Sequence, residues 1–125
     1  MNTLDQMVSA TQTPEAPTLL TVNIAKEFSS YPGARYRKDG PHSGEEFREK
    51  LLGPRFRQAL EQEQKLLVNL DGAEGYATSF LEEAFGGLAR EYGAQKVLAH
   101  LELRSLDEPL LVNEIEKYIR DAVQQ

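Results

Sequence analysis

The chain has 125 residues, a formal net charge of −6 and 40 % hydrophobic residues, which is the size and composition of a single globular domain. It contains no cysteine, so disulfides, thiol nucleophiles and cysteine-based metal sites are excluded. No apolar run approaches the roughly 20 residues that cross a bilayer, and the first residues lack the pattern of a signal peptide. We therefore expect a cytoplasmic protein without membrane association, and the acidic charge disfavours direct binding to nucleic acid.

The beginning of the chain offers little to bury. Residues 1–17 contain no aromatic and no basic side chain, so burial would not offset the entropy lost on ordering them. We predict a disordered N-terminal tail at 1–17 and one domain at 18–125. Residues 18–24 are rich in β-branched and apolar side chains, which predicts the first strand.

Turn dipeptides and a helix start follow this strand. Pro-Gly at 32–33 and Asp-Gly at 39–40 are compatible with one short edge strand between them. Ser43 is followed three residues later by Glu46, the capping-box pattern that begins a helix. The Gly-Pro pair at 53–54 predicts a kink or a second helical piece.

Strands and helices alternate through the second half of the chain. The short apolar run at 65–71 predicts a central strand buried on both faces. Apolar residues at 77, 80, 81, 84, 85 and 88 have helical spacing, which predicts an amphipathic helix that ends near Gly93. Residues 96–103 alternate and predict another strand, and Pro109 predicts the first turn of a last helix. This alternation predicts an α/β fold with a mixed β-sheet.

The sequence contains none of the common catalytic or nucleotide-binding motifs. It has no Gly-x-x-x-x-Gly-Lys-Ser/Thr loop, no strand-linked Gly-x-Gly-x-x-Gly, no His-Glu-x-x-His and no Gly-x-Ser-x-Gly. The two histidines, His42 and His100, stand apart in unremarkable contexts, which disfavours a zinc site or a Ser-His-acid triad. We therefore expect a protein that is not an enzyme and has no catalytic residue, metal or cofactor.

The most distinctive stretch joins the strand at 65–71 to the helix at 77–88. This junction contains Asp71, Gly75, Tyr76, Thr78 and Ser79. Ligands of open α/β sheets bind at such junctions, because free amides and the positive end of the helix favour anions. Ser79 with Glu82 also fits a capping box that needs no function. The hydroxyls of Thr78 and Ser79 are therefore either phosphorylation switch atoms or part of a helix cap.

Two adjacent glycines stand well inside the same predicted helix. Gly86 and Gly87 together cost about 2 kcal/mol relative to alanine, so a close contact with another backbone should offset them. Helical spacing places them with Glu82, Glu83 and Arg90 on a face that a monomer would expose to solvent. This face is either a partner surface, including one for a second copy of the chain, or a place of close packing against a neighbouring helix.

A cationic segment stands out on this acidic chain. Residues 35–57 carry seven basic and four acidic side chains. A turn and the predicted helix start bring together Arg35, Arg37, Asp39, Gly40, Ser43 and Gly44. Basic side chains beside free helix amides can hold a phosphate or a carboxylate. The alternative is a solvated charged loop.

Four blocks of the sequence carry a family resemblance. They are TVNIAKEF at 21–28, PGARYRKDGP at 32–41, SGEEFR at 43–48 and SFLEEAFGGL at 79–88. With these blocks the chain resembles the bacterial STAS-like domain of unknown function family, which is related to STAS domains such as the anti-sigma factor antagonists. The resemblance implies a single STAS-like domain, with a mixed sheet and helices mainly on one face. It also implies that Ser79, with Thr78 beside it, occupies the place of the hydroxyl that a histidine-kinase-type ATPase phosphorylates in the antagonists.

Two functions follow from these observations. The first is a non-enzymatic protein interaction module in a bacterial regulatory switch, which docks to such an ATPase through Asp71, Gly75, Tyr76, Glu82, Glu83, Gly86 and Gly87. In this function Ser79 and Thr78 are the switch atoms. The alternative is a small-anion or nucleotide sensor that uses the loop from Arg35 to Gly44.

Overall fold

The computed structural model describes residues 20–122. The tail predicted at 1–17 and the first two residues of the predicted first strand lie outside the described residues. Three parallel strands form one sheet in the order β1 (Leu20–Asn23), β2 (Leu66–Asn69) and β3 (Leu101–Arg104). The prediction of a central strand at 65–71 is confirmed, because β2 pairs with both of its neighbours. Its predicted burial on both faces is wrong, because Leu67 and Asn69 on the uncovered face are only half-buried.

Helices occupy both connections between the strands and the C-terminal end. The first connection contains α2 (Ile24–Glu27), the 3₁₀ turn η2 (Arg37–Asp39), α3 (Gly44–Phe47), the π-helical η3 (Arg48–Leu52) and α4 (Gly53–Glu61). The second contains α5 (Thr78–Leu81), the π-helical η4 (Glu82–Gly86), α6 (Gly87–Tyr92) and α7 (Ala94–His100), and α8 (Leu110–Ala122) follows β3. We call the continuous helix 44–61 the first rod and the continuous helix 78–92 the second rod.

The sheet is parallel throughout the described residues, so the prediction of a mixed sheet is wrong in this respect. Residues 31–41, which were compatible with an edge strand, form a loop with the single turn η2 instead. Backbone bonds from Gly33 to His42 and from Gly44 to Ala34 close this loop upon itself, so its amides and carbonyls are used locally and are not offered to a neighbouring strand. With helices between successive strands, parallel pairing is the expected outcome.

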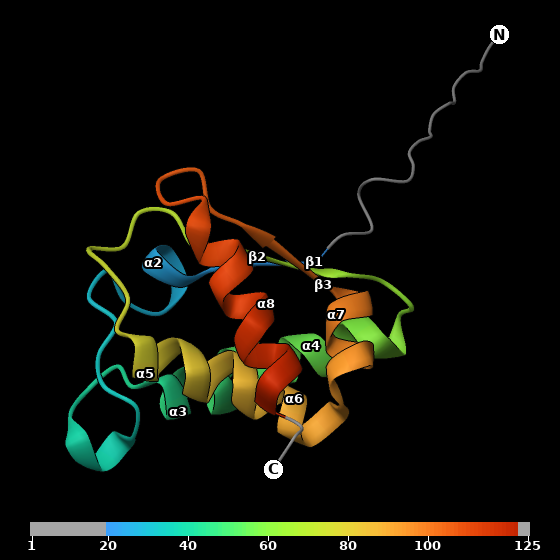
Figure 1. Cartoon of the computed structure of the whole chain (residues 1–125), viewed down its shortest axis with the longest axis horizontal. Helices are drawn as coiled ribbons and strands as arrows, with labels where there is room; N and C mark the ends of the chain where they lie inside the picture. The colour runs from blue at the N-terminus through green and yellow to red at the C-terminus, as the bar shows by residue number, and fades with distance from the viewer. Residues whose placement is uncertain (1–19, 123–125) are drawn as a thin grey trace, which may run out of the picture.

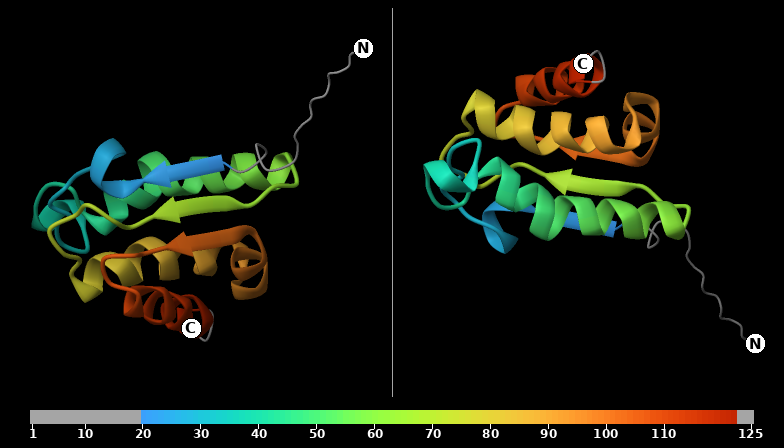
Figure 2. Two further views of the ribbon diagram at one scale, coloured as in Figure 1. Left: turned by 90° about the horizontal axis from the view of Figure 1, so that it is seen from above. Right: turned by 90° about the horizontal axis from the view of Figure 1, so that it is seen from below.

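The helices cover one face of the sheet. Seen from above, the three strands lie in front of the helices, and seen from below the two rods lie in front of the strands (Figure 2). The burial pattern agrees, since Val22, Leu66 and Val68 are fully buried while Glu102 and Arg104 are exposed. The helices therefore lie mainly on one face, as the family resemblance implied, and the other face carries mainly polar residues around Leu67.

Most helix ends follow the sequence signals. Ser43 is the N-cap of the first rod and its hydroxyl accepts a hydrogen bond from the Glu46 amide. Gly93, with a φ of +95°, follows the end of the second rod, where glycine adopts that conformation without strain. The strand predicted at 96–103 is wrong in its first half, because Ala94–His100 is helical. The apolar residues 94, 97, 98 and 101 in fact have helical spacing, and only the last three positions of the predicted strand, 101–103, lie in β3.

The two rods lie beneath the sheet (Figure 1), and an aromatic cluster joins them. Phe47 of the first rod and Phe80 of the second stack with their ring centroids 5.8 Å apart. Phe28, which follows α2, lies 5.3 Å from Phe47 and 6.3 Å from Phe80. The cluster fixes the start of the second rod against the first, and it thereby positions the strand-to-helix junction.

Candidate functional site

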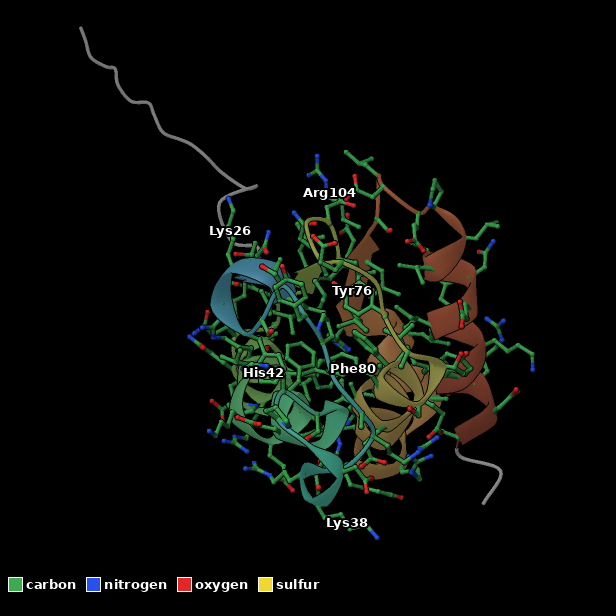
Figure 3. The ribbon with its side chains drawn as sticks, turned by 90° about the vertical axis from the view of Figure 1, so that its left-hand side faces the viewer. Lys26, Lys38, His42, Tyr76, Phe80 and Arg104 are labelled. Atoms are coloured by element: carbon green, nitrogen blue, oxygen red, sulfur yellow. The ribbon has the colours of Figure 1, made fainter. Side chains whose placement is uncertain are left out.

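The loops that follow the three strands meet at one end of the molecule. Figure 3 looks onto this end, where Lys26, Tyr76 and Arg104 are labelled. We call the loops at 28–31, 70–77 and 105–110 the carboxyl edge. In parallel sheets this edge is the usual place for ligands and partners, because several loops converge there.

The predicted junction loop is held in place by its own polar groups. The Asp71 carboxylate accepts hydrogen bonds from the amides of Leu106, at 2.8 Å, and Asp107, at 2.9 Å. The Tyr76 hydroxyl donates to the Leu70 carbonyl at 2.7 Å. Burial of this hydroxyl, together with repulsion from the Asp71 carboxylate, raises the pKa of Tyr76 well above its ordinary value. Both residues thus serve to order the loop. Gly75, with a φ of +142°, has open space where a side chain would lie.

The two candidate switch hydroxyls lie in the first turn of the second rod. Thr78 is exposed and Ser79 is half-buried. The N-cap is Ala77, which has no side-chain oxygen, and neither hydroxyl caps the helix. The capping-box interpretation of Ser79 with Glu82 is therefore wrong, because the helix begins one residue before Ser79. Neither hydroxyl therefore has a capping role.

This difference between two similar serines is testable. Ser43→Ala removes a fully buried cap hydroxyl and should lower the free energy of unfolding by about 1 kcal/mol. Ser79→Ala, the matched substitution at the second rod, removes no cap and should change it by less than about 0.5 kcal/mol. Urea unfolding followed by circular dichroism measures both values. Equal losses for the two variants would contradict the assignment of the caps.

The face that was predicted to be exposed at Gly86 and Gly87 is buried. Both glycines and Glu83 are shielded from solvent, so the prediction that these three residues contact a partner is wrong. A Cβ atom on Gly87 would lie 2.5 Å from Nε of Arg48, and one on Gly86 would lie 2.6 Å from a Glu82 oxygen. Gly87 is thus packed closely against the first rod, as the close-packing alternative predicts, whereas the nearest atoms to Gly86 belong to Glu82 of its own rod. Of the charged residues on this predicted face, Glu82 keeps partial exposure and Arg90 is exposed.

A cluster of three arginines and two glutamates lies at the crossing of the rods. Arg48 donates through Nη2 to the Glu83 carboxylate at 2.8 Å and through Nε to the Glu83 carbonyl at 3.1 Å. Glu82 accepts from Arg35 at 2.5 Å and from Arg90 at 2.8 Å. The hydrogen bond from Arg90 lowers the pKa of Glu82, partial burial opposes this, and the bond from Arg35 lowers it further. The sequence reasoning missed Arg48, because no local pattern shows that it reaches across to the second rod.

The predicted anion-binding residues do not converge on one site. The Gly44 amide donates to the Ala34 carbonyl at 2.9 Å and the Glu45 amide to the Arg35 carbonyl at 2.9 Å, so the helix amides that the prediction required are occupied. Arg37 pairs with Glu49 at 2.8 Å, away from Arg35. The remaining predicted residues have structural roles. Asp39 ends the turn η2, Gly40 follows it, and Ser43 caps the first rod.

The histidines and other ionisable residues form no further centre. His100 ends α7 with Nδ1 2.9 Å from the Lys96 carbonyl, and His42 packs edge-on against Phe28. Within residues 20–122 there is no cluster of three or more histidine or acidic residues that could hold a metal ion. Among the helices of this same stretch, none combines the length and the apolar character of a membrane-spanning segment.

Comparison with known proteins gives one match. The family model described as "STAS-like domain of unknown function (DUF4325)" matches residues 43–111, which is more than half of the chain. The matched stretch begins at the cap of the first rod and ends in the first turn of α8, so it contains the junction, the hydroxyls and Arg48. Neither a curated protein nor a solved structure matches the chain.

Proposed function

The chain belongs to the family of STAS-like domains of unknown function, and from this premise we propose that it is a non-enzymatic protein interaction module of a bacterial regulatory switch. It docks to its partner through the carboxyl edge. The observation that carries the proposal is the pair of hydroxyls on Thr78 and Ser79, which stand at this edge without a capping role.

Exposed apolar side chains at the same edge support docking. The four large apolar residues that are most exposed in the described chain are Tyr31, Tyr36, Leu106 and Leu110. Three of them lie at the carboxyl edge, with exposures of 70 % for Tyr31, 70 % for Leu106 and 79 % for Leu110. A gathering of such residues at one end is typical of a protein contact surface, whereas scattered ones are not.

The backbone of the junction loop connects these apolar side chains with the hydroxyls. The Glu74 amide donates to the Ser30 carbonyl at 2.8 Å, next to Tyr31. On the other side, Asp71 binds the Leu106 amide. The loop therefore lies between Tyr31 and Leu106, and it leads directly into Thr78. A partner that covers the loop would contact all three.

Phosphorylation of a hydroxyl would change this surface strongly. In this proposal the Ser79 or Thr78 oxygen attacks the γ-phosphate of ATP in a histidine-kinase-type ATPase partner, ADP leaves, and the hydroxyl proton passes to a base. The phosphate adds about −1.5 to −2 charges beside the uncapped helix start. The helix amides favour that charge, while Glu82, one turn away, opposes it. The affinity for the partner would change with the added charge, and the size of the change would depend on the attraction by the helix amides and the repulsion by Glu82.

The test is capture of the partner from a lysate of the source bacterium, with and without ATP, on the tagged full chain. We expect an ATPase among the bound proteins and a gain of about 80 Da in the intact mass of the bait, one phosphoryl group. Ser79→Ala or Thr78→Ala should abolish the gain. Leu106→Asp should weaken capture, and Ala99→Asp, the same kind of change on α7 at the other end of the sheet, should not. Capture that is equal for all variants, without a mass gain, would refute the proposal.

A further inference from the structure

An open cavity of about 740 Å³ lies where the loop at 35–36 meets the two rods. Its walls include Arg35, Tyr36, Arg48, Glu82, Gly87 and Arg90. Thr78 and Ser79 are not among the residues that line it, so this feature does not depend on the proposed switch. Its volume is in the range of small-molecule sites in proteins.

The charged side chains of this cavity form two layers. The inner layer is the pair of Arg48 with Glu83. The Glu83 side chain is only 9 % exposed, and the Glu83 backbone carbonyl accepts a further hydrogen bond from Arg48. The outer layer is Glu82 between Arg35 and Arg90, whose side chains are 25 %, 32 % and 33 % exposed. The inner pair is fixed by burial, whereas the outer carboxylate can turn into solvent.

The backbone is shaped to admit these groups. Gly87 leaves the space that the Arg48 side chain occupies, and Gly86 leaves the space for the Glu82 carboxylate. The π-helical turn Glu82–Gly86 directs both glutamates toward the arginines, and such turns are frequent at functional sites. The cavity is therefore built by the fold, and it is not a chance gap between surface side chains.

Glu82 occupies the place of an oxyanion ligand. Its two oxygens lie between guanidinium groups from two separate elements, at 2.5 Å from Arg35 and 2.8 Å from Arg90, which is how proteins hold carboxylates and phosphates. Donors remain for a ligand as well. Each guanidinium has five N–H groups, and within the described residues Nη2 of Arg35 and Nη1 of Arg48 donate no hydrogen bond.

We infer that this cavity binds a compact dianion of the phosphate class, which replaces the Glu82 carboxylate between Arg35 and Arg90. A free monocarboxylate would compete poorly with Glu82, because the tethered group has a high effective concentration. A dianion carries more charge and gains more from the two guanidiniums. Once Glu82 turns into solvent, three arginines face the remaining carboxylates of Glu83 and Glu91, which leaves the cavity cationic.

The test is calorimetric titration of the full chain with inorganic phosphate at low ionic strength. Glu82→Gln removes the internal competitor and should bind phosphate at least about tenfold more tightly than the wild type. Glu102→Gln makes the same change in net charge on the open face of the sheet and should leave binding unchanged. Two double variants test the arginines: Glu82→Gln combined with Arg90→Ala, and Glu82→Gln combined with Arg35→Ala from the opposite wall. Each should lose the gain in phosphate affinity. Acetate should bind at least about tenfold more weakly than phosphate.

Four results would overturn the inference. They are absence of saturable binding to folded Glu82→Gln protein up to about 10 mM phosphate, an equal gain in Glu102→Gln, retention of binding in both arginine variants, and acetate binding as tight as that of phosphate. Circular dichroism of each variant establishes that it is folded, and the two arginine variants lie on different elements, so misfolding of one leaves the other as the test.

Discussion

Replacing Phe80 by alanine is expected to lower the free energy of unfolding by about 3–5 kcal/mol, the largest effect of any substitution considered for this domain. The Phe80 side chain is fully buried, and its ring lies within 6.3 Å of the rings of Phe28, Phe47 and Tyr76. Alanine would leave a cavity at the point where the rods and the junction loop meet. Such a cavity costs both the transfer free energy and the lost contacts.

Chemical denaturation of the wild type and two variants measures this effect. Leu106→Ala removes a side chain that is 70 % exposed and should change stability by less than about 0.5 kcal/mol. It is a control for the loss of an apolar side chain near the same loop. A loss below about 1 kcal/mol for Phe80→Ala would show that the cluster does not hold the junction.

The same residue explains part of the sequence pattern around the hydroxyls. Phe80 is the third position of the second rod, so its ring is fixed while the Thr78 side chain remains exposed. The first turn of the rod therefore carries both a rigid anchor and two hydroxyls with access to solvent. A switch in this place would alter the surface of the domain and leave its core unchanged.

Periodic elements were predictable from the sequence because their signals are local. The helix at 77–88 follows from apolar spacing, the first rod from the cap at Ser43, and β2 from its continuous apolar run. The error at 96–100 arose where a helix and a strand both satisfy a short apolar pattern, so that only packing of Val97 into the core decides between them. The predicted mixed sheet failed because local bonds close the 31–41 loop, so that no edge strand forms there beside the three parallel strands.

The site was predictable only in part, because its contacts join residues far apart in the chain. The location of Thr78 and Ser79 at a strand-to-helix junction follows from local patterns. By contrast, Arg48 contacts Glu83 across 35 positions and Arg35 contacts Glu82 across 47. No periodicity encodes such pairs. The one available signal was the cost of two glycines inside a helix, which indicated a close contact but not the side chain that makes it.

Gly44→Ala is expected to lower the free energy of unfolding by about 1–3 kcal/mol, although alanine is the better helix former. An added Cβ would lie 2.5 Å from the Phe80 carbonyl oxygen and 3.2 Å from Cβ of Glu83. The obstacle is backbone of the second rod, which the buried Phe80 ring holds in place. The two rods would have to move apart, and the packing of Phe47 against Phe80 would loosen with them.

Gly86→Ala makes the same chemical change where the obstacle can move. Its Cβ would meet the tip of the Glu82 side chain at 2.6 Å, and this carboxylate can rotate toward solvent. The better helix propensity of alanine, about 1 kcal/mol, then offsets the weakened ion pairs with Arg35 and Arg90. We expect a change within about 1 kcal/mol in either direction. Urea unfolding of both variants compares the two sites directly, and a loss at Gly86 as large as that at Gly44 would mean that Glu82 is as rigid as the backbone.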